Sequence, residues 1–205
     1  MTQTLNPDTA SNMTSNMTTA RKAMIDSQLR TSGVNEPFVL TRMNSVARED
    51  FVPEAVKTSA YIDRAVPLGD GGFLPSPLFH GKVLAEAAPT QDDSVLIVEN
   101  GSGYLAELLR PLVGTLDTID AAQAATKSGR KTYSLILIDG AIEHLPDGFA
   151  KRIAEDGRIV TGIVTKGVTR LAMGRKIAGH TALQPLAELG IPILADFNAT
   201  KEWSF

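Results

Sequence analysis

A glycine turn between a strand and a helix is the first feature of this sequence that could bind a ligand. The apolar run SVLIVE at 94–99 is typical of a buried strand, and it leads through Gly101, Ser102 and Gly103 into a helical pattern. In open α/β sheets, ligands bind beyond the carboxyl ends of the strands, where glycines let the backbone approach a nucleotide-like group. The same residues could equally form a tight turn without a ligand, so alone they support both interpretations.

Two acidic residues end the next two predicted strands, TLDTID and YSLILID. Asp120 could accept hydrogen bonds from the ribose hydroxyls of an adenosine, although taken alone it more often caps the helix that follows. Asp139 ends the other strand, beside the expected pocket. Together with the glycine turn, Asp120 favours a nucleoside cofactor.

The loop after Asp139 contains Glu143 and His144. A carboxylate next to a histidine could support proton transfer. A turn followed by two solvated side chains is the more common outcome for such a sequence, and it is the interpretation we favour.

Composition and charge exclude several kinds of function. The 205-residue chain carries 20 Lys and Arg against 23 Asp and Glu, without the basic excess of proteins that bind phosphate backbones. It has no cysteine, and its three histidines are far apart, so we expect no metal site. No apolar run reaches the roughly 20 residues that cross a bilayer, and the N-terminus lacks the pattern of a secretory signal. We therefore predict a cytoplasmic protein that binds neither nucleic acid nor membrane, and we predict no oligomeric state.

The chain divides into three predicted parts. Residues 1–19 are rich in Thr, Asn, Ser and Met without periodicity, which predicts a disordered tail. Residues 20–76 predict a helical extension followed by a long loop rich in proline and glycine. Residues 77–205 alternate helix and strand, which predicts a mostly parallel α/β sheet with an antiparallel C-terminal pair joined at Gly179.

Longer motifs resemble those of one family. The order QLRTSGV, REDFVP, AYIDRAVPLGDGG, VLIVENGSGY, YSLILIDGAIEHLP and EDGRIVTGIV is similar to that of the protein-L-isoaspartate O-methyltransferase family. The resemblance runs from about Met24 to Val164 and implies a Rossmann-like methyltransferase fold with N-terminal helices. It also implies S-adenosylmethionine as cofactor and a protein or peptide as substrate or partner.

The resemblance assigns expected roles to individual residues. Gly101, Ser102 and Gly103 would form the turn at the methionine end of the cofactor. Asp120 would bind the ribose, and Asp139 would lie beside the pocket.

The sequence departs from the family pattern at the cofactor turn. Ile97 stands where the family has an acid, and Glu99 stands where it has its first glycine. A bulky carboxylate that is buried there without a partner is costly. We therefore expect S-adenosylmethionine binding to be weak or lost.

The expected substrate loop departs as well. The family motif GQTISQP, which holds two hydroxyl residues beside the target carboxylate, corresponds to GGFLPSP in this chain. Phe73 then takes the place of the threonine and Pro75 that of the serine. Ser76, displaced by one residue, is the remaining candidate catalytic hydroxyl.

Twelve residues separate Asp120 from Tyr133, where the family fits a helix, a further strand and a loop against the adenine. This gap is too short for those elements. It predicts a sheet shortened by one edge strand, in which 94–99 lies between 115–120 and 133–139, with 157–164 beyond.

Two hypotheses of function follow. The departures favour a pseudoenzyme, in which the scaffold is kept to bind a protein partner or another small molecule. The alternative is an active methyltransferase that transfers a methyl group from S-adenosylmethionine to isoaspartyl carboxylates in damaged proteins.

Overall fold

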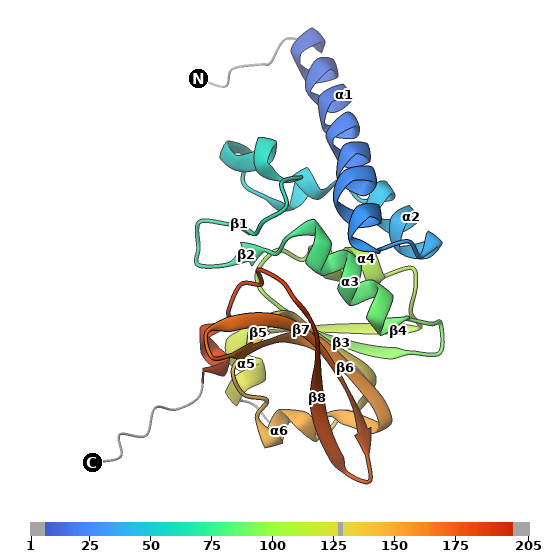
Figure 1. Cartoon of the computed structure of the whole chain (residues 1–205), viewed down its shortest axis with the longest axis vertical. Coiled ribbons are helices and arrows are strands. Elements are labelled where there is room, and N and C mark those ends of the chain that lie inside the picture. Colours follow the sequence, from blue (N-terminus) through green and yellow to red (C-terminus); the bar gives the residue numbers. More distant parts are fainter. Residues whose placement is uncertain (1–6, 127–128, 199–205) are drawn as a thin grey trace, which may run out of the picture.

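A six-stranded mixed sheet organises the protein (Figure 1). The computed structural model describes residues 7–126 and 129–198, with side chains from residue 15 onward. Across the sheet the strands are β4 (Thr115–Asp120), β3 (Ser94–Glu99), β5 (Tyr133–Ile142), β6 (Ile153–Thr165), β7 (Val168–Ile177) and β8 (His180–Glu188). The first four are parallel, and β7 and β8 run antiparallel to their neighbours.

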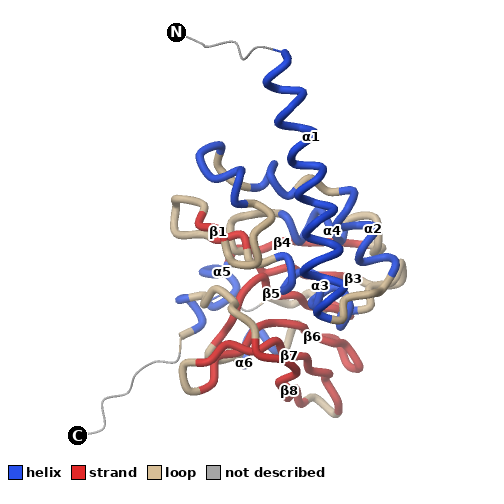
Figure 2. Tube along the Cα trace, turned by 45° about the horizontal axis from the view of Figure 1, so that its top comes forward, coloured by secondary structure: helices blue, strands red, loops and turns tan. Residues whose placement is uncertain are grey.

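The central strands are apolar on both faces because each face packs against its own core. Val95 and Ile97 of β3 belong to one core, and Leu96 and Val98 belong to the other. Helices α3 (Pro77–Ala87) and α4 (Tyr104–Leu109) cover the first face, and α5 (Ala121–Thr126) and α6 (Asp147–Ala150) cover the second (Figures 1 and 2). This arrangement confirms the predicted α/β fold.

The predicted shortening of the sheet is also confirmed. β4 pairs with β3, and among the described residues of 121–132 none pairs with its outer side. Polar groups also lie on this edge strand: Asp117 accepts hydrogen bonds from Lys131 Nζ at 2.5 Å and, across β3, from Tyr133 Oη of β5 at 2.7 Å. Charged groups on an edge strand discourage pairing with another chain.

The C-terminal strands form the predicted antiparallel pair. β7 and β8 are joined at Ala178 and Gly179, both in the left-handed region. The segment LPDGFAKRIAE at 145–155 has a helical pattern, but α6 ends at Ala150, because Ile153 is already a buried strand residue paired with Tyr133.

The N-terminal segment differs from its prediction. Helix α1 begins at Pro7 and ends at Met24, so residues 7–19 are helical where a disordered tail was expected, while residues 1–6 lie outside the described residues. Met17 and Ala20 pack against the first core, which extends the apolar stripe of the helix toward its start. No helix within residues 7–126 and 129–198 has the length and apolarity that a membrane span needs.

Short elements connect α1 to the sheet. A π-helical turn (Ile25–Leu29) and a 3-10 turn (Arg30–Ser32) continue α1, and α2 (Pro37–Ser45) follows. Two further 3-10 segments, Arg48–Phe51 and Glu54–Ser59, lead to a small hairpin of β1 (Val66–Pro67) and β2 (Phe73–Leu74). A last 3-10 turn, Ala195–Phe197, packs Phe197 into the second core.

Close packing of β6 on β5 predicts the effect of one substitution. A Cβ at Gly162 would lie 2.8 Å from Ala141 Cβ and 2.9 Å from Ile191 Cδ1. We expect Gly162→Ala to lower the free energy of unfolding in urea by about 1–3 kcal/mol, because neither neighbour can move without disturbing the core. Gly190→Ala, whose Cβ would have nothing within 4 Å, is the matched control and should have little effect. Equal stabilities of the two variants would contradict this explanation.

Candidate functional site

The glycine turn lies at the carboxyl end of β3, as the sequence predicts. Gly101 and Gly103 have φ angles of +89° and +70°, a region that side chains with a Cβ rarely adopt. These two glycines let the chain reverse within four residues between Glu99 and the start of α4. The turn thus places its backbone at the carboxyl end of β3, where ligands of such folds bind.

The β1–β2 hairpin lies directly on this turn. The Phe73 amide donates to the Asn100 carbonyl at 3.2 Å, and Phe73 forms an isolated bridge with Gly101. A Cβ at Gly72 would lie 2.7 Å from the Asn100 oxygen, so glycine is required for this close approach. The loop that the family resemblance assigns to the substrate is therefore in contact with the turn assigned to the cofactor.

Ser76 has a structural function at this place. Its side chain is almost fully buried, and its Oγ accepts a hydrogen bond from the Phe79 amide at 3.3 Å, which caps the N-terminus of α3. Pro77 follows as the first residue of the helix, where its missing amide costs nothing.

Asp120 lies where both of its predicted roles require it. It is exposed at the carboxyl end of β4, directly across from Glu99 of β3 in the strand register. Its Oδ1 accepts a hydrogen bond from the Gln123 amide at 2.7 Å, so it does cap α5. One carboxylate oxygen can cap a helix while the other accepts from a ligand.

Asp139 is not an open pocket residue. Its side chain is fully buried, with Oδ1 2.8 Å from His80 Nε2 and Oδ2 3.4 Å from Ser102 Oγ. The carboxylate therefore connects α3 to the glycine turn from within the protein interior.

A buried arginine, Arg48, determines which ring nitrogen of His80 carries the proton. Arg48 contacts His80 Nδ1 at 3.0 Å and also donates to the carbonyls of Ala60, at 2.6 Å, and of Pro75. A guanidinium has no acceptor, so Nδ1 of His80 must accept and its Nε2–H must donate to Asp139. His80 is thus neutral, and burial lowers its pKa despite the neighbouring carboxylate. Burial also lowers the pKa of Arg48, to about 10, which leaves it charged at neutral pH.

The Glu99 side chain lies against the glycine turn. Its Oε2 accepts a hydrogen bond from the Gly103 amide at 3.1 Å, whereas Oε1 is buried and has no hydrogen-bond partner among the described residues. Burial, followed by the charge of Asp139, raises the pKa of Glu99 to about 7. The side chain expected to obstruct the turn is therefore half paired, and it holds the turn together.

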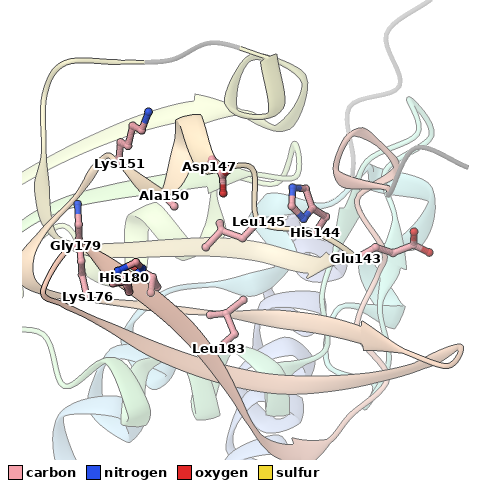
Figure 3. Close-up of a pocket in the computed structure, with 11 residues that line it drawn as sticks. Glu143, His144, Leu145, Asp147, Ala150, Lys151, Lys176, Gly179, His180 and Leu183 are labelled. Atoms are coloured by element: carbon pink, nitrogen blue, oxygen red, sulfur yellow. The ribbon is translucent and has the colours of Figure 1, made fainter. Parts of the chain in front are cut away.

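Glu143 and His144 do not form a proton-transfer pair. Both are exposed, and in Figure 3 the carboxylate of Glu143 points away from the ring of His144. They line a cavity of 520 Å³ together with α6 and the start of β8. That cavity includes no residue of the glycine turn, nor Asp120 or Asp139.

Sequence reasoning missed Arg48 and His80. Arg48 lies in the REDFVP motif, which carried the family resemblance, and His80 lies on an apolar helix. Their partners are distant in sequence, 32 residues between Arg48 and His80 and 59 between His80 and Asp139. No local pattern signals such a contact, although a histidine inside an apolar helix face requires a buried partner.

Comparisons with known proteins point to a single family. A family model described as Protein-L-isoaspartate(D-aspartate) O-methyltransferase matches residues 19–131. A relative from Koribacter versatilis is 30% identical over 78% of this chain and 83% of its own length. Relatives from Desulfosudis oleivorans and Methanospirillum hungatei are 28% and 26% identical, over 74% and 90% of this chain and over 80% and 98% of their own lengths. All three are named protein-L-isoaspartate O-methyltransferase.

Two solved structures share the fold. A Plasmodium falciparum protein described as a protein-L-isoaspartate O-methyltransferase, in complex with S-adenosyl-L-homocysteine, has a TM-score of 0.68 at 16% identity. It covers 88% of this chain and 98% of its own. A second protein-L-isoaspartate O-methyltransferase has a TM-score of 0.70 at 14% identity, over 87% of this chain and 67% of its own.

The pseudoenzyme hypothesis drawn from the sequence is wrong. Relatives that span most of the chain carry the name of the enzyme, and none of these comparisons indicates a degenerate member. The departures at Phe73, Pro75 and Glu99 are therefore differences within a family of enzymes.

Proposed function

The chain belongs to the protein-L-isoaspartate O-methyltransferase family, and on that premise we propose that it is an active member. It transfers a methyl group from S-adenosylmethionine to the carboxylate of isoaspartyl residues in damaged proteins. The relatives that align with most of this chain are named for this activity.

One structural observation carries the proposal. The β1–β2 hairpin is hydrogen bonded to the glycine turn through Phe73 and Asn100, so a peptide held by the hairpin would lie next to a cofactor held by the turn. Methyl transfer needs mainly this proximity, because a carboxylate is already a nucleophile and requires no base.

The residues at the turn fit S-adenosylmethionine. The cofactor is a nucleoside with a positively charged methionine end, and it supplies the electrophilic methyl group. Glu99 offers a buried carboxylate oxygen that has no partner within the described part of the chain, which suits a positive charge. Gly101, Ser102 and Gly103 would hold the methionine end, and Asp120 would accept from the ribose.

Asp139 and Ser76 support the site without touching the reacting atoms. Asp139 fixes the hydroxyl of Ser102 from inside the protein, and Ser76 fixes the start of α3 immediately after the hairpin. The expectation of weak cofactor binding rested on Ile97, on the shortened adenine wall and on an unpaired Glu99, and one oxygen of that carboxylate is paired. Weak binding stays a prediction that titration with S-adenosylmethionine tests.

The test compares two peptides of one sequence, with isoaspartate or ordinary aspartate at a single position. With labelled S-adenosylmethionine, the purified protein should form a methyl ester on the isoaspartyl peptide and none on the other. Esterification of neither peptide, or of both equally, would overturn the proposal.

A pair of glycine variants places the activity at the turn. Gly101→Ala forces a side chain into φ +89° and should reduce both cofactor affinity and methylation at least about tenfold. Gly167→Ala introduces comparable strain, at φ +77°, in the β6–β7 turn, where its Cβ would meet nothing within 4 Å. Equal loss of activity in both variants would mean that general destabilisation, and not the turn, is responsible.

A further inference from the structure

Two carboxylates meet under the glycine turn. The Gly103 amide donates to Glu99 Oε2 at 3.1 Å, and the preceding Ser102 hydroxyl lies 3.4 Å from Asp139 Oδ2. Consecutive residues of one turn thus contact two acids from neighbouring strands. Neighbouring like charges in a poorly solvated place oppose each other's ionisation, and the charge of Asp139 adds to the effect of burial in raising the pKa of Glu99.

The two carboxylates differ in their hydrogen bonds. Asp139 accepts from the Nε2–H of neutral His80, whose other nitrogen is fixed by the charged Arg48. Glu99 receives a single amide hydrogen bond and leaves Oε1 buried without a partner among the described residues. Its carboxylate therefore has fewer donors to offset burial, which raises its pKa.

The other charged groups around Glu99 do not neutralise it. Asp120 is its register neighbour on β4, and Asp70 lies on the β1–β2 hairpin, where it accepts from the Gly72 amide at 3.0 Å. The guanidinium of Arg48 donates to the carbonyls of Ala60 and Pro75 and contacts His80 Nδ1, and none of these hydrogen bonds goes to Glu99. The charged residues nearest to Glu99 at the glycine turn are therefore acidic.

We propose that Glu99, with Asp139 beside it, is a proton-linked cation site that selects S-adenosylmethionine over S-adenosylhomocysteine. The inference rests on the proposed function. S-adenosylmethionine carries a sulfonium and an ammonium, whereas S-adenosylhomocysteine has a neutral thioether and keeps only the ammonium. An ionised acid pair prefers the ligand with the additional positive charge, and it thereby favours release of the product.

Binding of the charged cofactor then requires release of a proton. The carboxyl group of Glu99 loses its proton to solvent when the cation binds, and no covalent bond to the ligand forms. Since the pKa of Glu99 is about 7 before binding, the ionised form is abundant at pH 8 and scarce at pH 6. Affinity for S-adenosylmethionine should therefore fall as the pH falls.

Calorimetric titration of the whole protein with each ligand tests this. Between pH 8 and pH 6 the Kd for S-adenosylmethionine should rise about tenfold, and that for S-adenosylhomocysteine less than about threefold. At pH 7 the heat should depend on the ionisation enthalpy of the buffer, which reports the released proton. Glu99→Gln should abolish both the pH dependence and the preference for S-adenosylmethionine.

Asp92→Asn is the matched control, because it removes one negative charge from an exposed residue just before β3, at the opposite end of that strand. It should bind both ligands as the parent does. Glu99→Gln retains the shape and an acceptor for the Gly103 amide, and circular dichroism of the variant checks that it folds.

The free protein provides an independent measurement. Because the pKa of Glu99 is raised from 4.5 to about 7 in the folded protein, stability is lost as the pH rises from about 4.5 to about 7, where the unfolded chain has released a proton that the folded protein still holds. Glu99→Gln should therefore have a higher Tm than the parent at pH 8, and the difference should narrow below pH 7 and disappear below about pH 4. Asp92→Asn should show no such dependence.

The outcomes separate this inference from the proposed function. If both ligands bind with the same pH dependence, or if Glu99→Gln binds as the parent does, the inference is overturned and the proposed function stands. If neither ligand binds at pH 8, both are overturned.

Discussion

Replacement of Arg48 with methionine is expected to lower the free energy of unfolding by about 3–5 kcal/mol, as the loss of one partner from a buried charged network does. Arg48 is fully buried and connects three parts of the chain, through the Ala60 carbonyl, the Pro75 carbonyl and the ring of His80. Methionine fills much of the space but leaves all three acceptors unpaired. Urea denaturation followed by circular dichroism measures the loss.

The same variant should lose methylation even under conditions where it is folded. Pro75 precedes Ser76, which caps α3, and β2 lies on the glycine turn, so release of the Pro75 carbonyl loosens the hairpin. Arg48→Lys should not restore activity, because one ammonium cannot reproduce the planar set of donors.

An exposed arginine is the control. Arg110 pairs with Glu107 on the surface of α4, with 65% of the arginine side chain exposed. Arg110→Met should change stability by less than about 1 kcal/mol, as is typical of surface pairs. A similarly small loss for Arg48→Met would show that the buried network does not hold these elements together.

The sheet could be predicted from the sequence because its signals are local. Apolar runs in β3 and β5 indicate strands buried on both faces, and the short segment after Asp120 indicates the missing outer strand. Two helix boundaries could not be predicted, because they depend on contacts with distant segments and not on local signals. Packing of Met17 on the core extends α1, and pairing of Ile153 with Tyr133 ends the helical segment early.

The candidate site could be predicted only in part. The glycine turn and Asp120 occupy strand ends, and the topology alone brings strand ends together. The state of Glu99 depends on Asp139, and that of Asp139 on His80 and Arg48 from distant segments. A substitution that the sequence alone presents as an obstruction is, in the structure, a hydrogen-bonded cap of the turn.

Another buried carboxylate, at the other end of β3 from Glu99, predicts the response of the protein to acid. Asp93 accepts from Arg158 through both oxygens, at 2.9 and 2.8 Å, from the Ser134 hydroxyl at 2.7 Å, and from the Thr90 amide at 2.8 Å. Although burial opposes ionisation, these hydrogen bonds hold the pKa of Asp93 well below its usual range. Arg158 also donates to the Ala87 carbonyl at the end of α3, so the pair joins that helix to β3 and β6.

Asp93→Asn should therefore lower the free energy of unfolding at pH 7 by about 3–5 kcal/mol, because the amide leaves the Arg158 charge uncompensated and presents a donor to other donors. The sign of the pH dependence follows from the lowered pKa of Asp93.

The stabilisation by Asp93 is complete above its unfolded pKa of about 4 and is lost as the pH falls toward the folded value. Urea denaturation of parent and variant should show a difference that is constant from pH 7 to about pH 5 and narrows below about pH 4. Asp26→Asn, at a side chain that is 73% exposed, should show neither effect. A difference that widens in acid would contradict this explanation, because it would mean that the folded protein binds a proton at Asp93 more readily than the unfolded chain does.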